Sequence, residues 1–389
     1  MAPNVYWVGV KHHNRRLFDG LIPLPHGTSY NAYLVVGSDK TALIDTVNPG
    51  FAEDLLGRIA EHMDPAKLDY VIMNHAEPDH ADAGRYVLDV AKNAKLVTSA
   101  KGKDAAIMYF GIDSERIIVV DESSKLELGG KTLKFIDAPW LHWPETIFTY
   151  LEEDKILFPC DFFGSHVAYG QFYADELGEG VSLDLAKLYF AEIMMPFRKP
   201  GQTAVEKVKK LGVKMIAPSH GVIWNDPKII LDAYTDWTGE KMKKKVLIPY
   251  VSMWGSTEKM VNALAGSLIN KGIEVQLFDL TNADIGHVAK ELIDSPVVVV
   301  GTPTVLNGMH PVAAYAAMLV KQLRSPTKYA ALLTSHGWSG GAVKAVQDLL
   351  GGTKIEILGV VDVKGPPKEA EFEKIKELAD KIEEKLSAL

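Results

Sequence analysis

Hydrophobic and polar residues follow two different patterns along the chain, and the change between them falls between Thr238 and Lys245. Before that point, short apolar runs with strand-like alternation outnumber the stretches with helical spacing. The predicted strands are residues 5–10, 30–36, 41–46, 70–73, 95–98, 116–120, 132–137, 146–151, 155–159 and 214–218. The predicted helices are residues 51–63, 81–92, 183–195 and 203–211. This balance favours two packed sheets with helices outside them.

After that point, strands and helices alternate regularly, which predicts an α/β fold with a doubly wound parallel sheet. The predicted strands are residues 246–251, 273–278, 296–301, 328–334 and 354–361. The predicted helices are residues 257–271, 285–293, 311–323, 340–350 and 368–387. Because a polar, lysine-rich stretch at residues 240–245 precedes the first strand, we expect one domain at residues 1–243 and a second at residues 246–389. Sheets of this kind bind ligands at the carboxyl ends of their strands.

The amino-acid composition of the chain limits the kinds of molecule that it is expected to bind. The formal net charge of −8 argues against nucleic acid, since phosphate binding needs clustered Lys and Arg. A single cysteine, Cys160, excludes disulfides within the chain and any zinc or iron–sulfur site built from several cysteines. The N-terminus has no signal pattern, and no apolar run approaches the roughly 20 residues of a membrane span. We therefore expect a cytoplasmic protein that uses neither nucleic acid nor membrane.

The densest set of candidate metal ligands directly follows the predicted strand at residues 70–73. Four residues able to bind metal occupy a six-residue strand-to-helix turn: His75, Glu77, Asp79 and His80. In a rigid turn the first three, which alternate, point to one side, and His80 joins them from the first helical turn. A solvated loop explains any one of these residues, but all four together at the end of a buried strand predict a metal site.

Three further candidates follow apolar runs elsewhere in the first domain: His142, Asp161 and His220. A single histidine near a strand end is more often structural than a metal ligand. Because the same local context recurs three times, we expect the three side chains to enter one cleft with the opening motif. Cys160 precedes Asp161 in a strand-like segment, so we expect it to face away from the metal and pack in the core.

In the second domain, three loops at strand ends predict a flavin site. The loop after the first strand, residues 252–257, brings hydroxyls and free backbone N–H groups to a helix N-terminus, which suits a phosphate. It has no G-x-G-x-x-G and no Lys, so a monophosphate such as that of FMN fits better than a dinucleotide or a nucleoside triphosphate. If this loop stood alone, its hydroxyls could simply cap the helix. Polar loops also follow the third and fourth strands, however, and the three loops together favour a flavin site. The expected FMN-binding residues are Ser252, Met253, Trp254, Gly255, Ser256, Thr257, Pro303, Thr304, Val305, Leu306, Asn307, Gly308, Ser335, His336, Gly337, Trp338, Ser339 and Gly340.

These motifs carry a resemblance to known folds. Residues 1–243 are similar to the metallo-β-lactamase fold, with Asp45 in its usual place after an early strand. Zinc hydrolases of this fold carry His-x-His-x-Asp-His, whereas Glu77 stands here for the second histidine. An oxygen-rich ligand set suits iron better than a histidine-dominated one, and it leaves manganese open. Residues 246–389 resemble flavodoxin, with Ser256 where asparagine is usual.

The two halves together resemble the flavodiiron proteins over nearly the whole chain. The resemblance implies that one iron is held by His75, Glu77 and His142, and the other by Asp79, His80 and His220, with Asp161 bridging the pair. Some members of the family leave the position of His80 unligated. His26 and His166 are candidate proton donors near the irons, because imidazole titrates close to neutral pH, and ordinary structural histidines are an equal alternative.

The resemblance implies an oxidoreductase that reduces dioxygen to water, nitric oxide to nitrous oxide, or both, with electrons from FMN. One cysteine cannot supply a rubredoxin iron site, so we expect the donor to be a separate rubredoxin or a reduced deazaflavin coenzyme. A head-to-tail homodimer or a dimer of dimers would bring each flavin to the partner's irons, with Trp338 as a contact across the interface. Two other classes remain open: a zinc-dependent hydrolase with a flavin domain, and a non-catalytic redox or gas sensor.

Overall fold

The computed structural model describes residues 1–239 and 241–389, which form two compact units. The first unit covers Met1–Gly239, and the second continues to Leu389. The division falls after Gly239, so residues 241–243 belong with the second unit and not with the first, where we expected them. Glu240, part of the lysine-rich stretch, lies outside the described residues.

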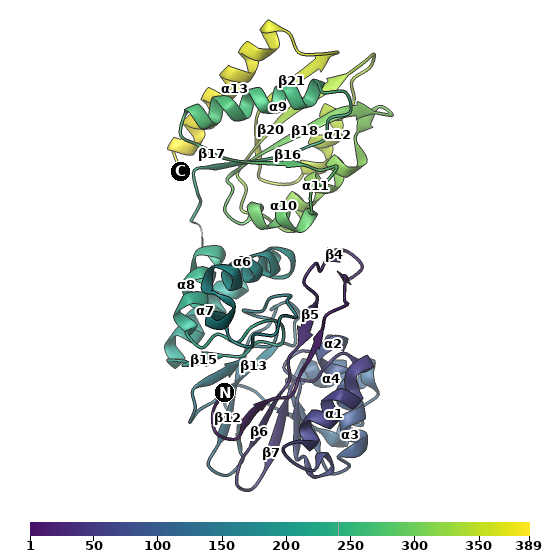
Figure 1. Ribbon diagram of the computed structural model, residues 1–389, viewed down its shortest axis with the longest axis vertical. Helices are drawn as coiled ribbons and strands as arrows, with labels where there is room; N and C mark the ends of the chain where they lie inside the picture. The colour runs from purple at the N-terminus through teal and green to yellow at the C-terminus, as the bar shows by residue number, and fades with distance from the viewer. Residues whose placement is uncertain (240) are drawn as a thin grey trace. The chain divides into compact units, whose positions relative to one another are not determined.

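The first unit contains two packed sheets (Figure 1). One sheet has the strand order β1 (Val5–Trp7), β6 (Tyr33–Val36), β7 (Thr41–Ile44), β8 (Tyr70–Ile72), β9 (Lys95–Thr98) and β10 (Ile117–Val119). The other has the order β11 (Lys125–Glu127), β12 (Thr132–Asp137), β13 (Ile147–Leu151), β14 (Ile156–Phe158) and β15 (Met215–Ile216). Side chains such as Tyr33, Ile72 and Phe135 share the buried cluster between the sheets.

Helices cover the outer faces of this sandwich. On the first sheet, α1 (Ala52–Ala60), α3 (Ala83–Val90) and α4 (Ala100–Phe110) bury apolar side chains in a second cluster. On the other side lie α6 (Glu179–Tyr189), α7 (Arg198–Leu211) and α8 (Pro227–Thr238) (Figure 1). The short helices α2 (Pro78–Ala81) and α5 (Ala174–Leu177) complete the unit. Helices outside two sheets are the arrangement expected from the sequence.

Several elements differ from the predictions. The predicted strand at residues 5–10 is interrupted and continues as β2 (Val10–His12), which pairs with β5 (Thr28–Tyr30). The chain crosses over at Gly9, where a Cβ atom would lie 2.3 Å from the Tyr30 carbonyl oxygen. The hairpin β3 (Leu17–Phe18) and β4 (Ile22–Pro23) was not predicted. Neither was α4, because its large apolar residues do not follow one face and several are exposed.

The second unit is built on a parallel sheet with the order β17 (Glu274–Asp279), β16 (Lys245–Tyr250), β18 (Val297–Val305), β20 (Tyr329–His336) and β21 (Glu356–Lys364). This 2-1-3-4-5 order is that of flavodoxin. On one face, α9 (Ser256–Asn270) and α13 (Glu369–Ser387) share a buried cluster with the strands. On the other lie α10 (Ile285–Leu292), α11 (Pro311–Gln322) and α12 (Ala342–Leu350) (Figure 1). Strand β18 extends beyond its predicted end and turns back through β19 (Gly308–Met309).

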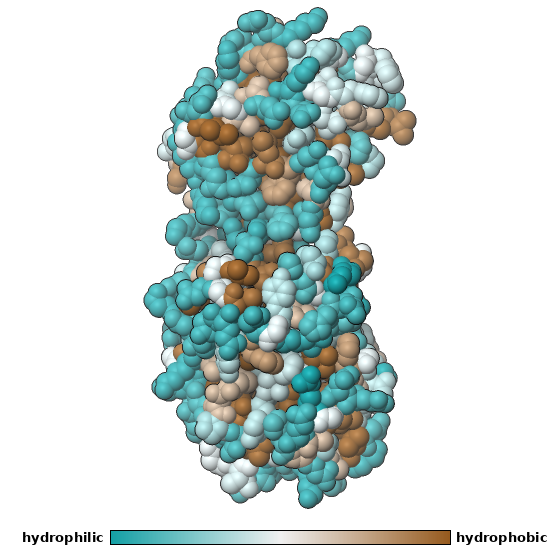
Figure 2. Space-filling view, in the orientation of Figure 1, coloured by the Kyte–Doolittle hydropathy of each residue, from teal (hydrophilic) through white to brown (hydrophobic). Residues whose placement is uncertain are grey.

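Apolar residues are interspersed with hydrophilic ones on the face shown in Figure 2. Within the described residues, none of the helices combines the length and the apolar character that a membrane span needs.

Candidate metal centre and flavin pocket

The turn that carries the opening motif is held by a buried hydrogen-bond hub. Asp45 accepts hydrogen bonds from the backbone N (2.8 Å) and Nδ2 (3.0 Å) of Asn74, which directly precedes His75. Asn74 also donates to the Phe158 carbonyl oxygen (3.2 Å) and accepts from Thr149 Oγ1 (2.7 Å), and both of these lie on the second sheet. Burial raises the pKa of Asp45 to about 6. The hub therefore ties the metal-binding turn to both sheets.

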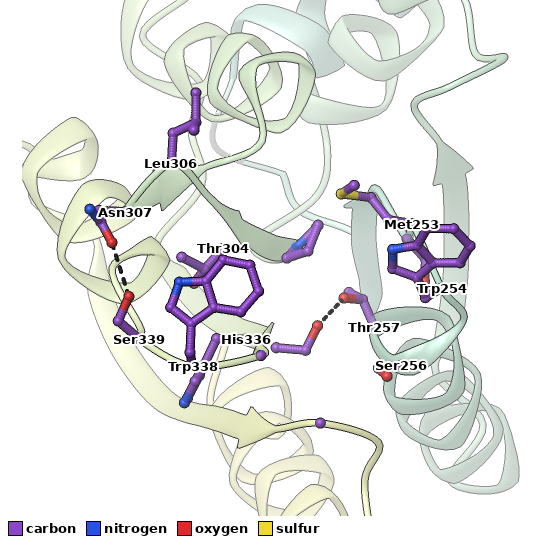
Figure 3. A pocket seen from close by; sticks show the side chains of 15 residues that line it. Met253, Trp254, Ser256, Thr257, Thr304, Leu306, Asn307, His336, Trp338 and Ser339 are labelled. Atoms are coloured by element: carbon purple, nitrogen blue, oxygen red, sulfur yellow. Dashed lines mark hydrogen bonds between the residues drawn. The ribbon is translucent and has the colours of Figure 1, made fainter.

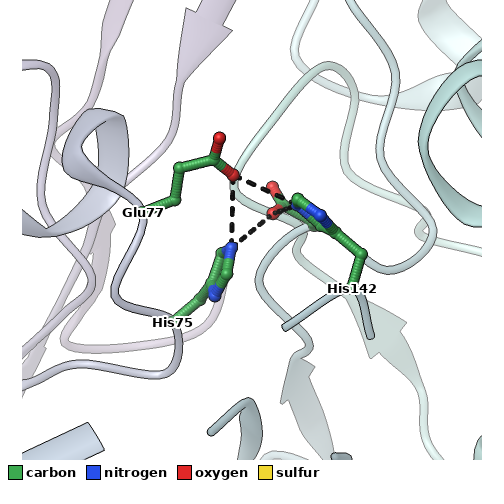
Figure 4. A group of neighbouring side chains, drawn as sticks. His75, Glu77 and His142 are labelled. Atoms are coloured by element: carbon green, nitrogen blue, oxygen red, sulfur yellow. Dashed lines mark hydrogen bonds and ion pairs between the residues drawn. The ribbon is translucent and has the colours of Figure 1, made fainter. Parts of the chain in front are cut away.

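One group of candidate ligands contains His75, Glu77 and His142 (Figure 4). Glu77 Oε2 lies 3.2 Å from His75 Nε2 and 3.1 Å from His142 Nε2. Asp161 Oδ2 faces the same two imidazoles at 3.5 and 3.4 Å. Four ligand atoms from three separate loops thus converge on one point.

A second group contains Asp79, His80 and His220. Asp79 Oδ1 lies 3.4 Å from His80 Nε2, and Asp79 Oδ2 lies 3.4 Å from His220 Nε2. Asp161 reaches this group with its other oxygen, because Oδ1 lies 2.9 Å from His80 Nε2 and 3.5 Å from His220 Nε2. The single Asp161 carboxylate therefore stands between the two groups with one oxygen toward each.

Several of these atoms are buried without a hydrogen-bond partner: both carboxylate oxygens of Asp79, both ring nitrogens of His80, and Asp161 Oδ2. Buried polar groups without partners are costly and rare in folded proteins. Close contact without hydrogen-bond geometry is expected where lone pairs converge on a cation. Three carboxylates and four imidazoles fit two divalent metal ions.

The pKa values of two histidines in the site also indicate a place for positive charge. Burial acts to lower the pKa of His75, but hydrogen bonds to Glu145 and Glu77 outweigh it and raise the pKa to about 9. Burial also acts to lower the pKa of His80, and the charges of Asp79 and Asp161 raise it to about 9. The carboxylates thus favour positive charge in the site, a charge that either protons or metal ions can supply.

Outer contacts select the ring nitrogen that faces the metal. Glu145 Oε1 accepts a hydrogen bond from His75 Nδ1 (2.7 Å) and another from the backbone N of Ala76 (3.0 Å). His220 Nδ1 donates to the Ser29 carbonyl oxygen (2.5 Å). Both contacts leave Nε2 for the metal, as is usual for ligand histidines. The sequence reasoning missed Glu145, whose only signal is its place three residues after His142, and it had no means of finding a backbone carbonyl.

The two candidate proton donors lie in different surroundings. His26 Nδ1 contacts the Tyr169 hydroxyl (2.7 Å) near the surface, and no contact joins His26 to the candidate ligands. His166 is buried, with its ring centroid 4.9 Å from that of His220 and Nδ1 2.9 Å from Thr28 Oγ1. Burial holds the pKa of His166 well below its usual range, so the imidazole is neutral. The structure therefore brings the ring of His166 against that of His220, while His26 lines a small cavity together with His166.

The expectation for Cys160 is wrong in one respect. The residue is buried, as predicted, but its Sγ lies near the ligand atoms of His80 and Asp161, with all three within 4.8 Å of one another. Cys160 has φ 49°, a left-handed conformation that breaks the alternation of side chains along a strand. The inference from strand alternation therefore fails here. Burial raises the pKa of the thiol well above its usual value, so the group is uncharged.

In the second unit, a cavity of about 480 Å³ opens at the carboxyl ends of β16, β18 and β20 (Figure 3). Most of the expected FMN-binding residues line it: Ser252, Met253, Trp254, Ser256, Thr257, Pro303, Thr304, Leu306, Asn307, Ser335, His336, Gly337, Trp338 and Ser339. Four expected residues do not line it: Gly255, Val305, Gly308 and Gly340. Gly365, after β21, lines the cavity and was missed, because the loop after the fifth strand has no hydroxyl pattern.

The loop before α9 presents the donors that a phosphate needs. Gly255 has φ 80°, which lets the chain turn into the helix at Ser256. Ser252 Oγ accepts from the backbone N of Glu258 (3.2 Å), so its own proton is free to donate. Thr257 is buried, and its Oγ1 is 3.0 Å from Ser335 Oγ, so that hydroxyl already has a partner. The hydroxyls of Ser252 and Ser256 are the better candidates for a phosphate.

Large apolar side chains stand in solvent around this cavity. Trp254 is 91% exposed, Trp338 is 88% exposed and Leu306 is 97% exposed. Figure 3 shows Trp254 and Met253 on one side of the cavity and Trp338 on the other. Such exposure is unusual for large apolar groups and marks a surface that binds a planar ligand or a partner.

Comparisons with known proteins agree with the folds of both units. Residues 28–221 match the ODP family beta lactamase, and residues 248–378 match flavodoxin. A nitric oxide reductase of Moorella thermoacetica is 37% identical over 98% of this chain and 97% of that protein. A coenzyme F420H2 oxidase of Methanothermobacter marburgensis is 34% identical over 90% of this chain and 89% of that protein.

The structure of rubredoxin oxygen:oxidoreductase from Desulfovibrio gigas covers 100% of this chain and 98% of its own, with a TM-score of 0.95 at 32% identity. The likeness spans both domains in the same order, as the sequence motifs implied. With a β-lactamase-like domain and a flavodoxin domain in one chain, and relatives of nearly the same extent, this chain belongs to the flavodiiron protein family.

Proposed function

We propose that the protein reduces dioxygen to water or nitric oxide to nitrous oxide at two iron ions that receive electrons from FMN. The observation that carries this proposal is the Asp161 carboxylate, which has one oxygen toward each of two groups of candidate ligands. Two iron ions held by these two groups of ligands would bind a diatomic gas and would supply it with two electrons together. Relatives named for nitric oxide reduction and for oxygen reduction support the two substrates.

In this proposal, His75, Glu77 and His142 hold one iron, while Asp79, His80 and His220 hold the other. His80 is included because its Nε2 faces both Asp79 and Asp161. Glu145 and the Ser29 carbonyl fix the imidazole orientations, and the hub of Asp45 and Asn74 fixes the turn. These contacts keep the ligand geometry in place whatever the charge on the metal ions.

Aromatic packing around the ligands limits the access of water. The Trp143 ring meets His75 edge-on with centroids 5.1 Å apart, and Phe18 packs against His166 and His220 at 4.7 and 5.9 Å. Tyr189, which is also buried, lies 5.9 Å from His220. A dry site strengthens every charge interaction within it. In this proposal His166, whose ring packs against that of His220, relays to the site the protons that the reduction consumes.

The cavity of the second unit holds FMN in this proposal, with its phosphate at the N-terminus of α9 and its ring between the exposed tryptophans. The electron donor is a separate rubredoxin or a reduced deazaflavin coenzyme, the donors named in two relatives. A head-to-tail dimer or a dimer of such dimers, located in the cytoplasm, pairs each flavin with the partner's irons.

The proposed activity predicts fast reoxidation of the flavin by gas. The reduced protein, loaded with FMN and iron, is mixed without other oxidants with dioxygen or nitric oxide in a stopped-flow instrument. At least one gas should restore the oxidised flavin spectrum, with water or nitrous oxide as product. Asp161→Ala, which removes the shared carboxylate, should lose this step and keep its flavin. Reoxidation no faster than that of free FMN would contradict the proposal, and two zinc ions without iron would favour a hydrolase.

Glu77→His tests the selection of iron. The change restores the histidine of the zinc hydrolases and removes the oxygen atom shared by His75 and His142. We expect zinc to replace iron and gas reduction to stop, while FMN stays bound. Metal analysis and visible absorbance decide the outcome, with Glu61→His on the exposed end of α1 as the matched control. Normal iron content with normal turnover would show that Glu77 does not select the metal.

Removal of two hydroxyls tests the phosphate loop. Ser252→Ala with Ser256→Ala removes two donors, each contributing about 1.5–3 kcal/mol when the acceptor is charged. Flavin affinity should fall by about two to four decades. Fluorescence titration of the apoprotein with FMN measures this, and Ser267→Ala on the same helix, outside the pocket, is the control. Unchanged affinity would place the phosphate elsewhere.

Mixed dimers test the path of the electrons. One chain carries Ser252→Ala with Ser256→Ala and lacks FMN, and the other carries His142→Ala with Asp161→Ala and lacks iron. Coexpressed with distinct tags, they form a heterodimer that holds one intact flavin and one intact metal centre on different chains. Transfer between chains predicts that part of the activity returns, whereas each homodimer stays inactive. Purified heterodimers with both cofactors but no gas reduction would exclude the crossed arrangement.

A further inference from the structure

His336 is the one ionisable side chain among the lining residues of the flavin cavity in the part of the chain that the structure describes. The other lining residues carry hydroxyl, amide, thioether, indole or aliphatic side chains, or are glycine. No Lys or Arg is among them. A flavin gains negative charge when it is reduced, and nearby positive charge stabilises that form. In this cavity His336 is the side chain that can acquire such a charge.

A carboxylate behind the ring sets which nitrogen is basic. His336 Nδ1 lies 3.1 Å from Asp362 Oδ1, and Thr334 Oγ1 donates to the same oxygen at 2.6 Å. An ionised carboxylate only accepts hydrogen bonds, so Nδ1 carries the proton and Nε2 keeps its lone pair. No described protein group hydrogen-bonds Nε2. The arrangement is that of a general base oriented by a carboxylate.

The surroundings of the pair favour this role. A Cβ atom at Gly340 would lie 3.2 Å from Asp362 Oδ2 and 3.5 Å from His336 Nδ1, so the backbone of that loop closes over the pair. The loop at residues 337–341 carries no ionisable side chain. Strand β21 supplies the charged neighbours, namely Asp362 and also Lys364, which is paired in register with His336. Asp362 Oδ1 is in direct contact with the ring at 3.1 Å, whereas Lys364 is exposed.

We propose that His336 takes up a proton when the bound flavin is reduced and so balances the charge of the reduced ring. The inference rests on the proposed function in that FMN must occupy this cavity. Two electrons from the donor and one proton convert the oxidised flavin into its reduced anion. A second proton, from solvent, binds His336 Nε2 and not the flavin. When the flavin returns its electrons, both protons are released.

The test is the pH dependence of the midpoint potential of bound FMN, measured by dye-equilibrated redox titration between about pH 5 and 8, where imidazoles titrate. If one extra proton is taken up with the two electrons, the reduction equilibrium of FMN changes a further tenfold per pH unit. The slope of the midpoint potential against pH is then steeper by about 30 mV per pH unit. In the wild type this extra slope should appear over part of the range. In His336→Gln it should be absent, so that the variant's potential falls below that of the wild type at low pH and converges with it at high pH.

Two further variants sharpen the result. Asp362→Asn removes the carboxylate that favours the protonated ring, so the extra slope should move to lower pH. His287→Gln, a change of the same type on α10 and outside the cavity, should keep the wild-type slope. Equal slopes in the wild type and His336→Gln, with FMN tightly bound in both, would overturn this inference alone. A wild type that does not hold FMN in this cavity would overturn the proposed function together with it.

Discussion

Three carboxylates that lie in contact with four largely buried imidazoles require positive charge among them. Glu77, Asp79 and Asp161 stand around four histidines with little access to water. Taken out of water without a counter-charge, such groups cost several kcal/mol each. Protons on the imidazoles meet part of this demand, as the raised pKa values of His75 and His80 show. Two metal ions would meet it fully and would also give a role to the oxygens of Asp79, to His80 Nε2 and to Asp161 Oδ2, which have no hydrogen-bond partner.

The fold provides this arrangement because both sheets end their strands at the same place. The turn after β8 brings the opening motif from the first sheet, and the loops around β13, β14 and β15 bring His142, Asp161 and His220 from the second. Asn74 contacts both sheets through Asp45 and Phe158. The core between the sheets therefore determines the distances among the ligands, and the ligands need few contacts of their own. In the second unit, too, the cavity lies where strands end, at the carboxyl ends of the parallel sheet.

Much of the site was predictable because its residues follow apolar runs. That local signal identified the seven candidate ligands and most of the cavity lining. The contacts that orient these side chains depend on the tertiary structure and cannot be predicted from a local sequence pattern. Glu145 contacts His75 from another loop, and the register of neighbouring strands brings Asp362 to His336. Cys160 was misjudged because a left-handed residue breaks the alternation of a strand. Helix α4 was missed because its apolar residues lack helical periodicity.

The central claim is that Asp161 joins two iron ions into one centre. X-ray absorption at the iron edge of the purified, iron-loaded protein measures this directly. The account predicts two iron ions per chain and an iron–iron distance below about 4 Å, the range of carboxylate-linked metal pairs. In Asp161→Ala that iron–iron signal should vanish. A wild-type protein with a single iron per chain, or with two irons and no iron–iron signal, would contradict the account.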